Sequence, residues 1–268
     1  MLLTLSESET LNALLRELNY PDIARISNEI SEHISASTTT YTQIITRLKQ
    51  HEPWEYIRGW AEFCGSRFNV TPATLIPRLE TETLVERGIE IAKDMLKVSK
   101  ELQIVDIGTG SGAIIISVAK GLSTANGINY IATDISESAL TVARENAQLN
   151  LVNNVDFLNS NLIESDKINF NAPTLLLANL PYLGEAEFDT LDLSVKLYEP
   201  KSALVAGVTG HELYLQLLDA CENFSVPPRQ LWEISSFIIQ PLTTELVKRK
   251  IPHNVVRDQF DTDRFIEL

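Results

Sequence analysis

The stretch from Leu102 to Lys120 decides the fold, and it reads LQIVD, IGTGSG and AIIISVAK. LQIVD (102–106) is an apolar run of the length of a buried strand, and AIIISVAK (113–120) continues as a helix. The turn between them is Gly108-Thr109-Gly110-Ser111-Gly112. A glycine-rich turn between a strand and a helix lies at the sheet edge where α/β proteins bind ligands. The stretch therefore predicts an α/β fold built around this turn.

Further strand patterns follow along the chain. Their sequences are YIATD (130–134), VDFLN (155–159), TLLLANL (174–180), QLWEIS (230–235), VVRDQF (255–260) and RFIEL (264–268). Helical patterns lie between the first strands, at 80–97 before LQIVD and at 241–250 near the end, which favours a doubly wound, mostly parallel sheet. The catalytic domain is expected to span residues 80–268.

A different pattern fills the beginning of the chain. Apolar residues recur at helical spacing over 11–18, 23–34 and 41–48, before any strand pattern begins. Such stripes predict a small helical bundle, expected as a separate N-terminal domain over residues 1–52 that selects the substrate. Aromatic and β-branched residues then alternate from Trp54 to Val70, which predicts a β-hairpin within a linker at 53–79.

Composition narrows the kinds of partner. The 268 residues carry 22 basic and 36 acidic side chains, a formal charge of -14, which repels phosphate backbones. We therefore expect no stable nucleic-acid binding. No apolar run has the length of a membrane span, and Cys64 and Cys221 lie far apart, so a cytoplasmic protein is expected.

Two acidic residues indicate what the turn binds. Asp106 ends the strand before the glycines, where a pyrophosphate would be repelled and the ammonium of a methionine moiety attracted. Asp134 ends the next strand, at a position where a carboxylate binds ribose hydroxyls. The pair predicts an adenosine cofactor without phosphates. The alternative is that the glycines only form a tight turn and Asp134 only caps a helix.

The third candidate element is Asn179-Leu180-Pro181-Tyr182, at the carboxyl end of the fourth strand. An amide nitrogen is a poor nucleophile, so an enzyme that methylates it must hold both N–H groups and aim the nitrogen. The side-chain oxygen of Asn179 and the main-chain oxygen of Leu180 can accept those hydrogens, Pro181 stiffens the turn, and Tyr182 can stack on the amide. We expect catalysis by positioning and electrostatics, without a strong base.

Together these motifs resemble class I methyltransferases that act on planar nitrogens. The segment Thr74–Glu82, TLIPRLETE, closely resembles the signature of release factor glutamine methyltransferases, the HemK or PrmC family. Further matches to that family are Glu199-Pro200, Ala203-Leu204, Gly210-His-Glu-Leu-Tyr214 and the stretch Asp258 to Arg264. The resemblance covers the chain from about Pro53 to its end.

The resemblance implies a class I S-adenosylmethionine-dependent methyltransferase with a Rossmann-like, mostly parallel seven-stranded sheet. The expected reaction is methylation of the glutamine side-chain amide in the Gly-Gly-Gln motif of class 1 peptide chain release factors, by a monomer. The cofactor would be lined by Gly108–Gly112, Asp134, Ile135, Leu162 and Asn179, with Asn161 near the adenine amino group. Asn179 to Tyr182 would hold the glutamine.

The residues leave alternatives open. Leu180 stands where the family has proline, and a similar Asn-Leu-Pro-Tyr occurs in ribosomal RNA adenine dimethyltransferases, so an adenine-N6 RNA or DNA methyltransferase is one rival. A glutamine methyltransferase of a ribosomal protein and a non-catalytic interaction module are others. Asn161 and Ser235 also differ from the family's aspartate and glycine. The scattered histidines have no ligand spacing, and no metal is expected.

Overall fold

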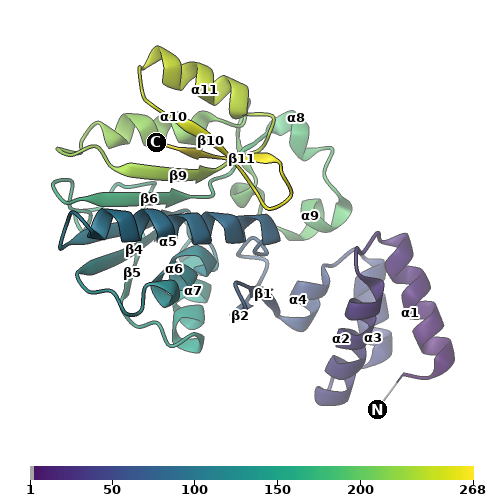
Figure 1. Cartoon of the computed structure of the whole chain (residues 1–268). Helices are drawn as coiled ribbons and strands as arrows, with labels where there is room; N and C mark the ends of the chain where they lie inside the picture. The colour runs from purple at the N-terminus through teal and green to yellow at the C-terminus, as the bar shows by residue number, and fades with distance from the viewer. Residues whose placement is uncertain (1–2) are drawn as a thin grey trace. The chain divides into compact units, whose positions relative to one another are not determined.

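The computed structural model describes residues 3–268. Within that range the chain divides into two compact units (Figure 1). The first unit ends at Gly59 and also includes Asp192–Tyr198. The second consists of Trp60–Leu191 and Glu199–Leu268. The strands predicted from Leu102 onward all fall in the second unit.

The first unit is a helical bundle. Its helices are α1 (Leu5–Glu17), α2 (Ile23–Ala36), α3 (Tyr41–Lys49), α4 (Trp54–Arg58) and α9 (Leu193–Tyr198). The side chains of Thr4, Asp22 and Thr40 accept from the first turns of α1, α2 and α3 and so begin these helices. Their apolar stripes form one core, as the periodicity predicts.

The helix α4 corrects the prediction that a hairpin begins at Trp54. Pro53 precedes the helix and suits its first turn, and Gly59, at φ 83°, ends it in the left-handed region. The Trp54 indole is fully buried and donates to Glu29 at 2.9 Å, and Arg58 pairs with the same carboxylate at 2.6 Å. These contacts make Trp54–Arg58 part of the bundle core rather than a strand.

The hairpin itself follows at once. Strands β1 (Trp60–Phe63) and β2 (Ser66–Asn69) pair antiparallel, with Phe63 opposite Ser66. The turn residues Cys64 and Gly65 both have positive φ, 47° and 62°, as a tight two-residue hairpin turn requires. The hairpin therefore occupies only the second half of the predicted stretch.

The second unit is built on a mixed sheet. Its strands, within residues 3–268, are β3 (Leu102–Ile107), β4 (Ile128–Asp134), β5 (Val155–Asn159), β6 (Thr174–Ala178), β9 (Arg229–Glu233), β10 (Asn254–Arg257) and β11 (Asp263–Glu267). They lie in the order β10-β11-β9-β6-β3-β4-β5. All neighbours from β9 to β5 run parallel, and only β11 and β10 are antiparallel. The predicted mostly parallel, seven-stranded sheet is confirmed.

Helices cover both faces of this sheet (Figure 1). The helices α5 (Glu82–Leu96), α6 (Ala113–Gly121) and α7 (Glu137–Leu149) pack on one face, where residues such as Ile104 and Leu177 point. On the other face α10 (Glu212–Cys221) and α11 (Ile239–Lys248) pack against their neighbours, such as Val105 and Leu176. The alternation is that of a doubly wound three-layer fold.

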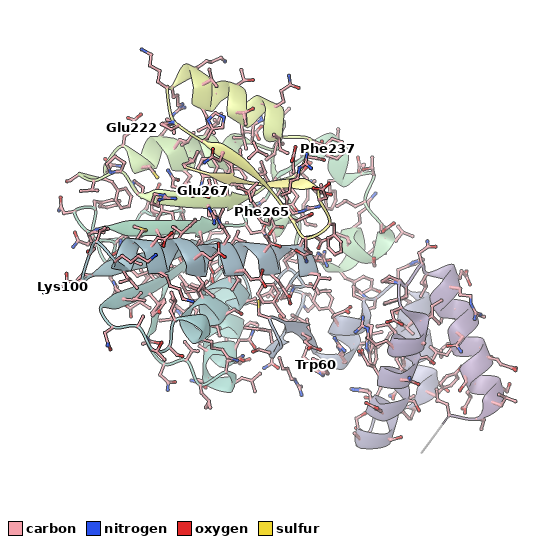
Figure 2. All side chains as sticks on the ribbon, viewed as in Figure 1. Trp60, Lys100, Glu222, Phe237, Phe265 and Glu267 are labelled. Atoms are coloured by element: carbon pink, nitrogen blue, oxygen red, sulfur yellow. The ribbon has the colours of Figure 1, made fainter. Side chains whose placement is uncertain are left out.

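An ion pair ties α5 to the antiparallel edge of the sheet. Figure 2 shows Phe265 and Glu267 on β11. Phe265 is buried in the core beneath α5, and Glu267 binds Arg87 of α5 at 2.9 Å and Arg229 of β9. The helix that precedes the glycine turn is therefore held against strands from the other end of the chain.

Shorter elements border the ligand edge of the sheet. They are η1 (Leu79–Thr81), β7 (Leu183–Gly184), α8 (Glu185–Phe188), η2 (Lys201–Ala203) and β8 (Val205–Gly207). The strands β7 and β8 form a small parallel pair that the sequence patterns did not predict. Among the described residues, none of the helices has the length and apolar character of a membrane span.

Candidate active site

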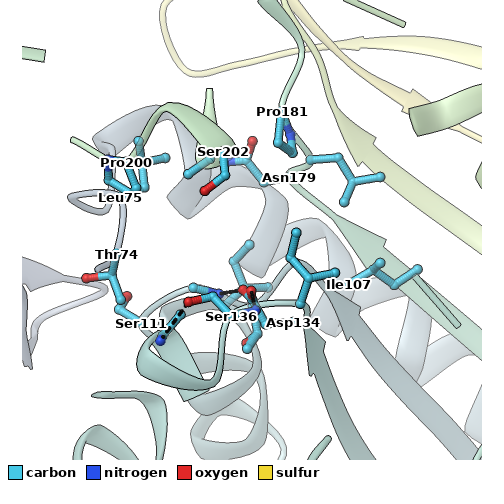
Figure 3. Close-up of a pocket in the computed structure, with 18 of the residues that line it drawn as sticks. Thr74, Leu75, Ile107, Ser111, Asp134, Ser136, Asn179, Pro181, Pro200 and Ser202 are labelled. Atoms are coloured by element: carbon cyan, nitrogen blue, oxygen red, sulfur yellow. Dashed lines mark hydrogen bonds between the residues drawn. The ribbon is translucent and has the colours of Figure 1, made fainter. Parts of the chain in front are cut away.

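A cavity opens where β3, β4, β5 and β6 end, and Figure 3 shows part of its wall. It contains ≈ 1040 Å³ of empty space, open solvent included. Its wall consists of the loops after those strands, the segment from Ala73 to Thr81, and residues around Pro200. All of these belong to the second unit.

The glycine turn forms one side of the cavity. Gly108, Gly110 and Gly112 have φ of 70°, 56° and 80°, which side chains other than glycine rarely adopt. A Cβ on Gly110 would meet nothing within 4 Å, whereas one on Gly112 would lie 2.9 Å from Ile116 and 3.2 Å from Ala143. Gly110 therefore leaves room for a ligand, and Gly112 allows α6 and α7 to pack closely.

Asp134 stands beside this turn at the end of β4. Its Oδ2 accepts from the N–H of Gly110 and its Oδ1 from the N–H of Ser136, each at 2.9 Å. Burial raises the pKa of Asp134 above its usual value, and the N–H donors, including that of Ile135, oppose the rise. The carboxylate is thus held in one orientation at the cavity wall, with lone pairs left for ligand hydroxyls.

Asp106 lies behind the turn and is fully buried. The Thr109 hydroxyl donates to its Oδ2 at 2.6 Å, whereas Oδ1 has no hydrogen-bond partner among the residues that the structure describes. The pKa of this carboxyl is raised to about 7, chiefly by burial and also by the charge of Asp134, while the Thr109 hydroxyl and the Ile115 N–H oppose the rise. A carboxyl behind the turn favours a cationic ligand group in the neighbouring cavity over an anionic one.

The loop after β5 closes the cavity on the side of β4. Asn161, Leu162 and Ile135 line the wall, as do Thr109 and Ser111 from the glycine turn. Leu162 has φ 48°, and its main-chain oxygen accepts from the Thr133 hydroxyl at 2.7 Å, which fixes the strained residue. Asn161 is exposed and its side chain donates to Glu164 at 3.2 Å.

Asn179, Leu180 and Pro181 line the cavity from the end of β6. In the view of Figure 3, Asn179 and Pro181 lie across the cavity from Asp134 and Ser136. The side-chain nitrogen of Asn179 donates to the Thr81 hydroxyl at 3.3 Å, and this hydrogen bond restricts the rotation of the Asn179 amide. The structure thus brings Asn179, Leu180 and Pro181 to the same cavity as Gly110 and Asp134.

Three predicted residues do not line the wall. Asp106 and Gly112 lie behind the glycine turn, and Tyr182 packs partly buried against the core on the α10 face. Burial raises the pKa of the Tyr182 phenol to about 12, and the nearby Glu233 carboxylate raises it further. Tyr182 therefore stays neutral at ordinary pH.

The structure adds supporting residues that the motif analysis did not assign. Tyr214 of α10 is fully buried, and its hydroxyl lies 3.2 Å from the N–H of Leu180 and 3.3 Å from its main-chain oxygen. The same hydroxyl donates to the main-chain oxygen of Glu233. Arg78 pairs with the buried Glu199 at 2.5 Å and so joins two segments of the cavity wall. Thr81, Tyr214 and Glu199 all lie in motifs that the sequence analysis quoted, and their place in those motifs is the sequence feature that could have identified them.

Asn146 of α7 lies in none of the quoted motifs, so no sequence feature singled it out. Its side-chain oxygen accepts from the N–H of Asn69 at 2.6 Å, and its nitrogen donates to the main-chain oxygens of Asn69 and Ser111 at 3.0 and 2.9 Å. The side chain is fully buried. One amide therefore ties the β1–β2 hairpin to the glycine turn.

The chemistry of the wall fits S-adenosylmethionine. At Gly110 a ligand can approach the backbone closely, and Asp134 offers a carboxylate to ribose hydroxyls. The Asp106 carboxyl, buried behind the turn, favours an ammonium group over an anionic one. The wall offers no cluster of Lys or Arg side chains for a diphosphate, since Arg78 is its only basic residue among those described. These donors suit an adenosine linked to an amino acid.

Known proteins point to the same class. Residues 98–182 match the family described as methyltransferase domain. The release factor glutamine methyltransferase of Enterococcus faecalis is 37% identical over 220 residues, which is 81% of this chain and 74% of that protein. The protein of the same name from Lactococcus lactis is 35% identical over 237 residues, covering 85% and 81% of the two chains.

Solved structures agree on the fold. The catalytic domain of hMettl16 in complex with MAT2A 3'UTR hairpin 1 superposes with a TM-score of 0.58 at 16% identity, covering 75% of this chain and 72% of the other. The N-terminal domain of human METTL16 in complex with SAH gives 0.52 at 16% identity, covering 75% and 74%. At this identity the likeness concerns the fold alone. From its sequence relatives, the chain belongs to the release factor glutamine methyltransferase family.

Proposed function

We propose that this protein transfers a methyl group from S-adenosylmethionine to the side-chain amide nitrogen of the glutamine in the Gly-Gly-Gln motif of a class 1 peptide chain release factor. The observation that carries the proposal is the position of Asn179. It lies at the end of β6 in the same cavity as Gly110 and Asp134, where an acceptor oxygen can face the bound cofactor.

Different residues contact the different parts of S-adenosylmethionine in this proposal. Asp134 binds the ribose hydroxyls, Ile135, Asn161 and Leu162 border the adenine, and Gly108 to Ser111 pass close to the methionine part. Asp106 attracts the ammonium group from behind the turn. When bound, the cofactor supplies an electrophilic methyl group.

The chain's own residues then act on the substrate. Asn179 Oδ1 and the main-chain oxygen of Leu180 accept the two N–H hydrogens of the glutamine amide and aim its nitrogen at the methyl group. As the nitrogen lone pair forms the new bond to carbon, positive charge develops on nitrogen, and the two oxygens stabilise it. The nitrogen then loses one of its two protons to water, which leaves a neutral methylated amide. Tyr214 holds the Leu180 backbone in place through its hydroxyl. No nucleophilic side chain takes part.

The test is a transfer assay with a defined acceptor. The purified protein is incubated with S-adenosylmethionine and a release factor, and the Gly-Gly-Gln peptide is examined by mass spectrometry. We expect one added methyl group on the glutamine, and none on a release factor in which that glutamine is replaced by glutamate. A structured adenine-containing RNA serves as competitor substrate. Methylation of the RNA instead would establish the adenine-N6 reaction and overturn the proposal.

A further inference from the structure

The carboxylate of Glu199 has both of its oxygens engaged. Its Oε1 accepts from a guanidinium nitrogen of Arg78 at 2.5 Å, and its Oε2 accepts from the main-chain N–H of Ile76 at 3.3 Å. The side chain of Glu199 is 1% exposed. A carboxylate buried so completely is costly unless its charge and its lone pairs are matched, and here one cation and one backbone donor match them.

Both donors come from one irregular stretch of chain, Leu75 to Arg78. Pro77 in the middle of this stretch has no N–H to donate, and it keeps the preceding Ile76 in an extended conformation. The backbone of the stretch is therefore poorly suited to a helix or a sheet ladder, so a side chain from elsewhere has to hold it. Its residues nevertheless form part of the cavity wall, since Leu75, Pro77 and Arg78 line it.

Glu199 stands where the chain returns to the second unit. The segment Asp192–Tyr198 belongs to the first unit, and the second resumes at Glu199. Pro200 follows and restricts the Glu199 backbone to an extended conformation, which limits the directions that its side chain can take. Pro200, Ser202 and Ala203 then line the cavity. One carboxylate therefore joins two segments of the wall that are 121 to 123 residues apart in sequence.

The two joined segments face the carboxylate that is expected to bind the cofactor ribose. In the view of Figure 3, Leu75 and Pro200 lie across the cavity from Asp134. All three residues line the same cavity. Asp134 is held by its own hydrogen bonds to the backbone. The distance between the two sides of the cavity therefore depends on what holds the side opposite Asp134, and the bonds of Glu199 do so.

We propose that Glu199 is a positioning residue for the cofactor, which fixes the wall opposite Asp134 through its bonds to Arg78 and Ile76. The inference rests on the cofactor part of the proposed function and deepens it. Glu199 touches neither cofactor nor substrate in this account, because it lies behind the residues that line the cavity. Its effect is on the affinity for S-adenosylmethionine.

The experiment compares matched variants. Glu199→Gln keeps the size of the side chain, but an amide has one oxygen and one NH₂ group, so one of the two donors must then face another donor. Arg78→Met removes the cation at similar length. The control is Glu185→Gln, because Glu185 pairs with Lys201 of η2 at 2.7 Å while both side chains are more than half exposed. Cofactor affinity is measured by calorimetry with S-adenosylhomocysteine.

We expect Glu199→Gln to raise the Kd for S-adenosylhomocysteine roughly 10- to 100-fold, the scale of a charged hydrogen bond. Glu185→Gln should stay within about twofold of the wild type. Arg78→Met should raise the Kd strongly by itself but less than about threefold when added to Glu199→Gln, because the two residues act through one ion pair. In the transfer assay the KM for S-adenosylmethionine should rise with the Kd, whereas the KM for the release factor should change less than about threefold.

A second readout needs neither cofactor nor turnover. The N–H of Ile76 donates directly to Glu199, so its hydrogen exchange reports the bond. In the ligand-free protein, a peptide covering residues 73–78 should exchange at least about tenfold faster in Glu199→Gln, and peptides from β3 should be unchanged. A variant that is only less stable would exchange faster throughout the second unit.

Two results would overturn the inference. One is a Glu199→Gln variant whose Kd stays within about twofold of the wild type. The other is a fully additive loss in the double variant with exchange raised equally in residues 73–78 and in β3, which would mean a general stabilising role. A wild type that binds S-adenosylhomocysteine and leaves the glutamine unmethylated would instead refute the proposed methyl transfer.

Discussion

The main-chain N–H of Gly110 donates a hydrogen bond of 2.9 Å to Oδ2 of Asp134. The bond joins the turn after β3 to the end of β4, and both border the cavity. It fixes the carboxylate before any ligand arrives, because the Ser136 N–H holds the other oxygen at the same distance. The site is thus preorganised for ribose hydroxyls.

Asp134→Asn should weaken cofactor binding while leaving the fold intact. Asparagine keeps one acceptor oxygen but loses the charge and turns an N–H₂ group toward one of the two backbone donors. We expect the Kd for S-adenosylhomocysteine to rise about 10- to 100-fold, the usual range for a charged hydrogen bond. Calorimetry measures it. Asp156→Asn, whose side chain is 52% exposed on β5, is the matched control and should bind like the wild type.

Asp106→Asn should make the protein more stable than the wild type, and the difference in stability should increase as pH rises. The pKa of the folded carboxyl is raised from 3.8 to about 7, so its favourable protonation in the folded state is complete below 3.8 and is lost as pH rises through about 7. The variant has no such loss. Its Tm advantage over the wild type should grow between about pH 4 and pH 7 and then stay constant.

Thermal scans in buffers across that range provide the measurement, and the same variant should bind S-adenosylhomocysteine more weakly. An equal Tm difference at every pH would show that Asp106 is not a destabilising buried charge. Such a gain in stability with a loss of binding is common where a buried group serves function.

Tyr214→Phe should loosen the Asn179-Leu180 backbone. The change removes the hydroxyl that lies 3.2 Å from the N–H of Leu180 and leaves that buried donor without its partner. We expect a loss of about 1–3 kcal/mol in the free energy of unfolding and a lower kcat. Denaturant titrations measure the first quantity. Tyr198→Phe, whose hydroxyl binds the main-chain oxygen of Gln50 at the surface, is the control and should cost less.

Asn146→Ala tests the tie between the hairpin and the glycine turn. It removes three hydrogen bonds of a buried side chain, two to Asn69 and one to the oxygen of Ser111. The free energy of unfolding should fall by about 3 kcal/mol, and the cofactor affinity should fall with it because Ser111 lines the cavity. The exposed Asn153→Ala should change neither. A stable variant with normal affinity would contradict the bracing role.

The sheet was predictable because buried parallel strands have nearly continuous apolar sequences. LQIVD and TLLLANL are both of this kind. The convergence of Asp106, Asp134 and Asn179 followed from the same reasoning, since the carboxyl ends of parallel strands share one edge. Composition and motif together were enough for the fold and for the edge of the sheet at which the cavity opens.

Other features depend on tertiary geometry that no local pattern records. Thr81 and Asn179 are 98 residues apart, and Tyr214 and Leu180 are 34 apart, so their hydrogen bonds are set by how segments pack. Trp54–Arg58 was read as strand because a five-residue helix is too short to show a helical period. Asn146 looked like any polar residue on a helix, although both ends of its amide are used.

The most direct test of the central claim is the methylation state of the release factor glutamine after reaction with the wild type and with Asn179→Ala. The exposed Asn223→Ala serves as control. The account predicts one methyl group on the glutamine with the wild type and control, and at least about a 100-fold slower transfer with Asn179→Ala. Transfer by Asn179→Ala at the wild-type rate, or an unmethylated glutamine beside a protein that binds the cofactor, would contradict it.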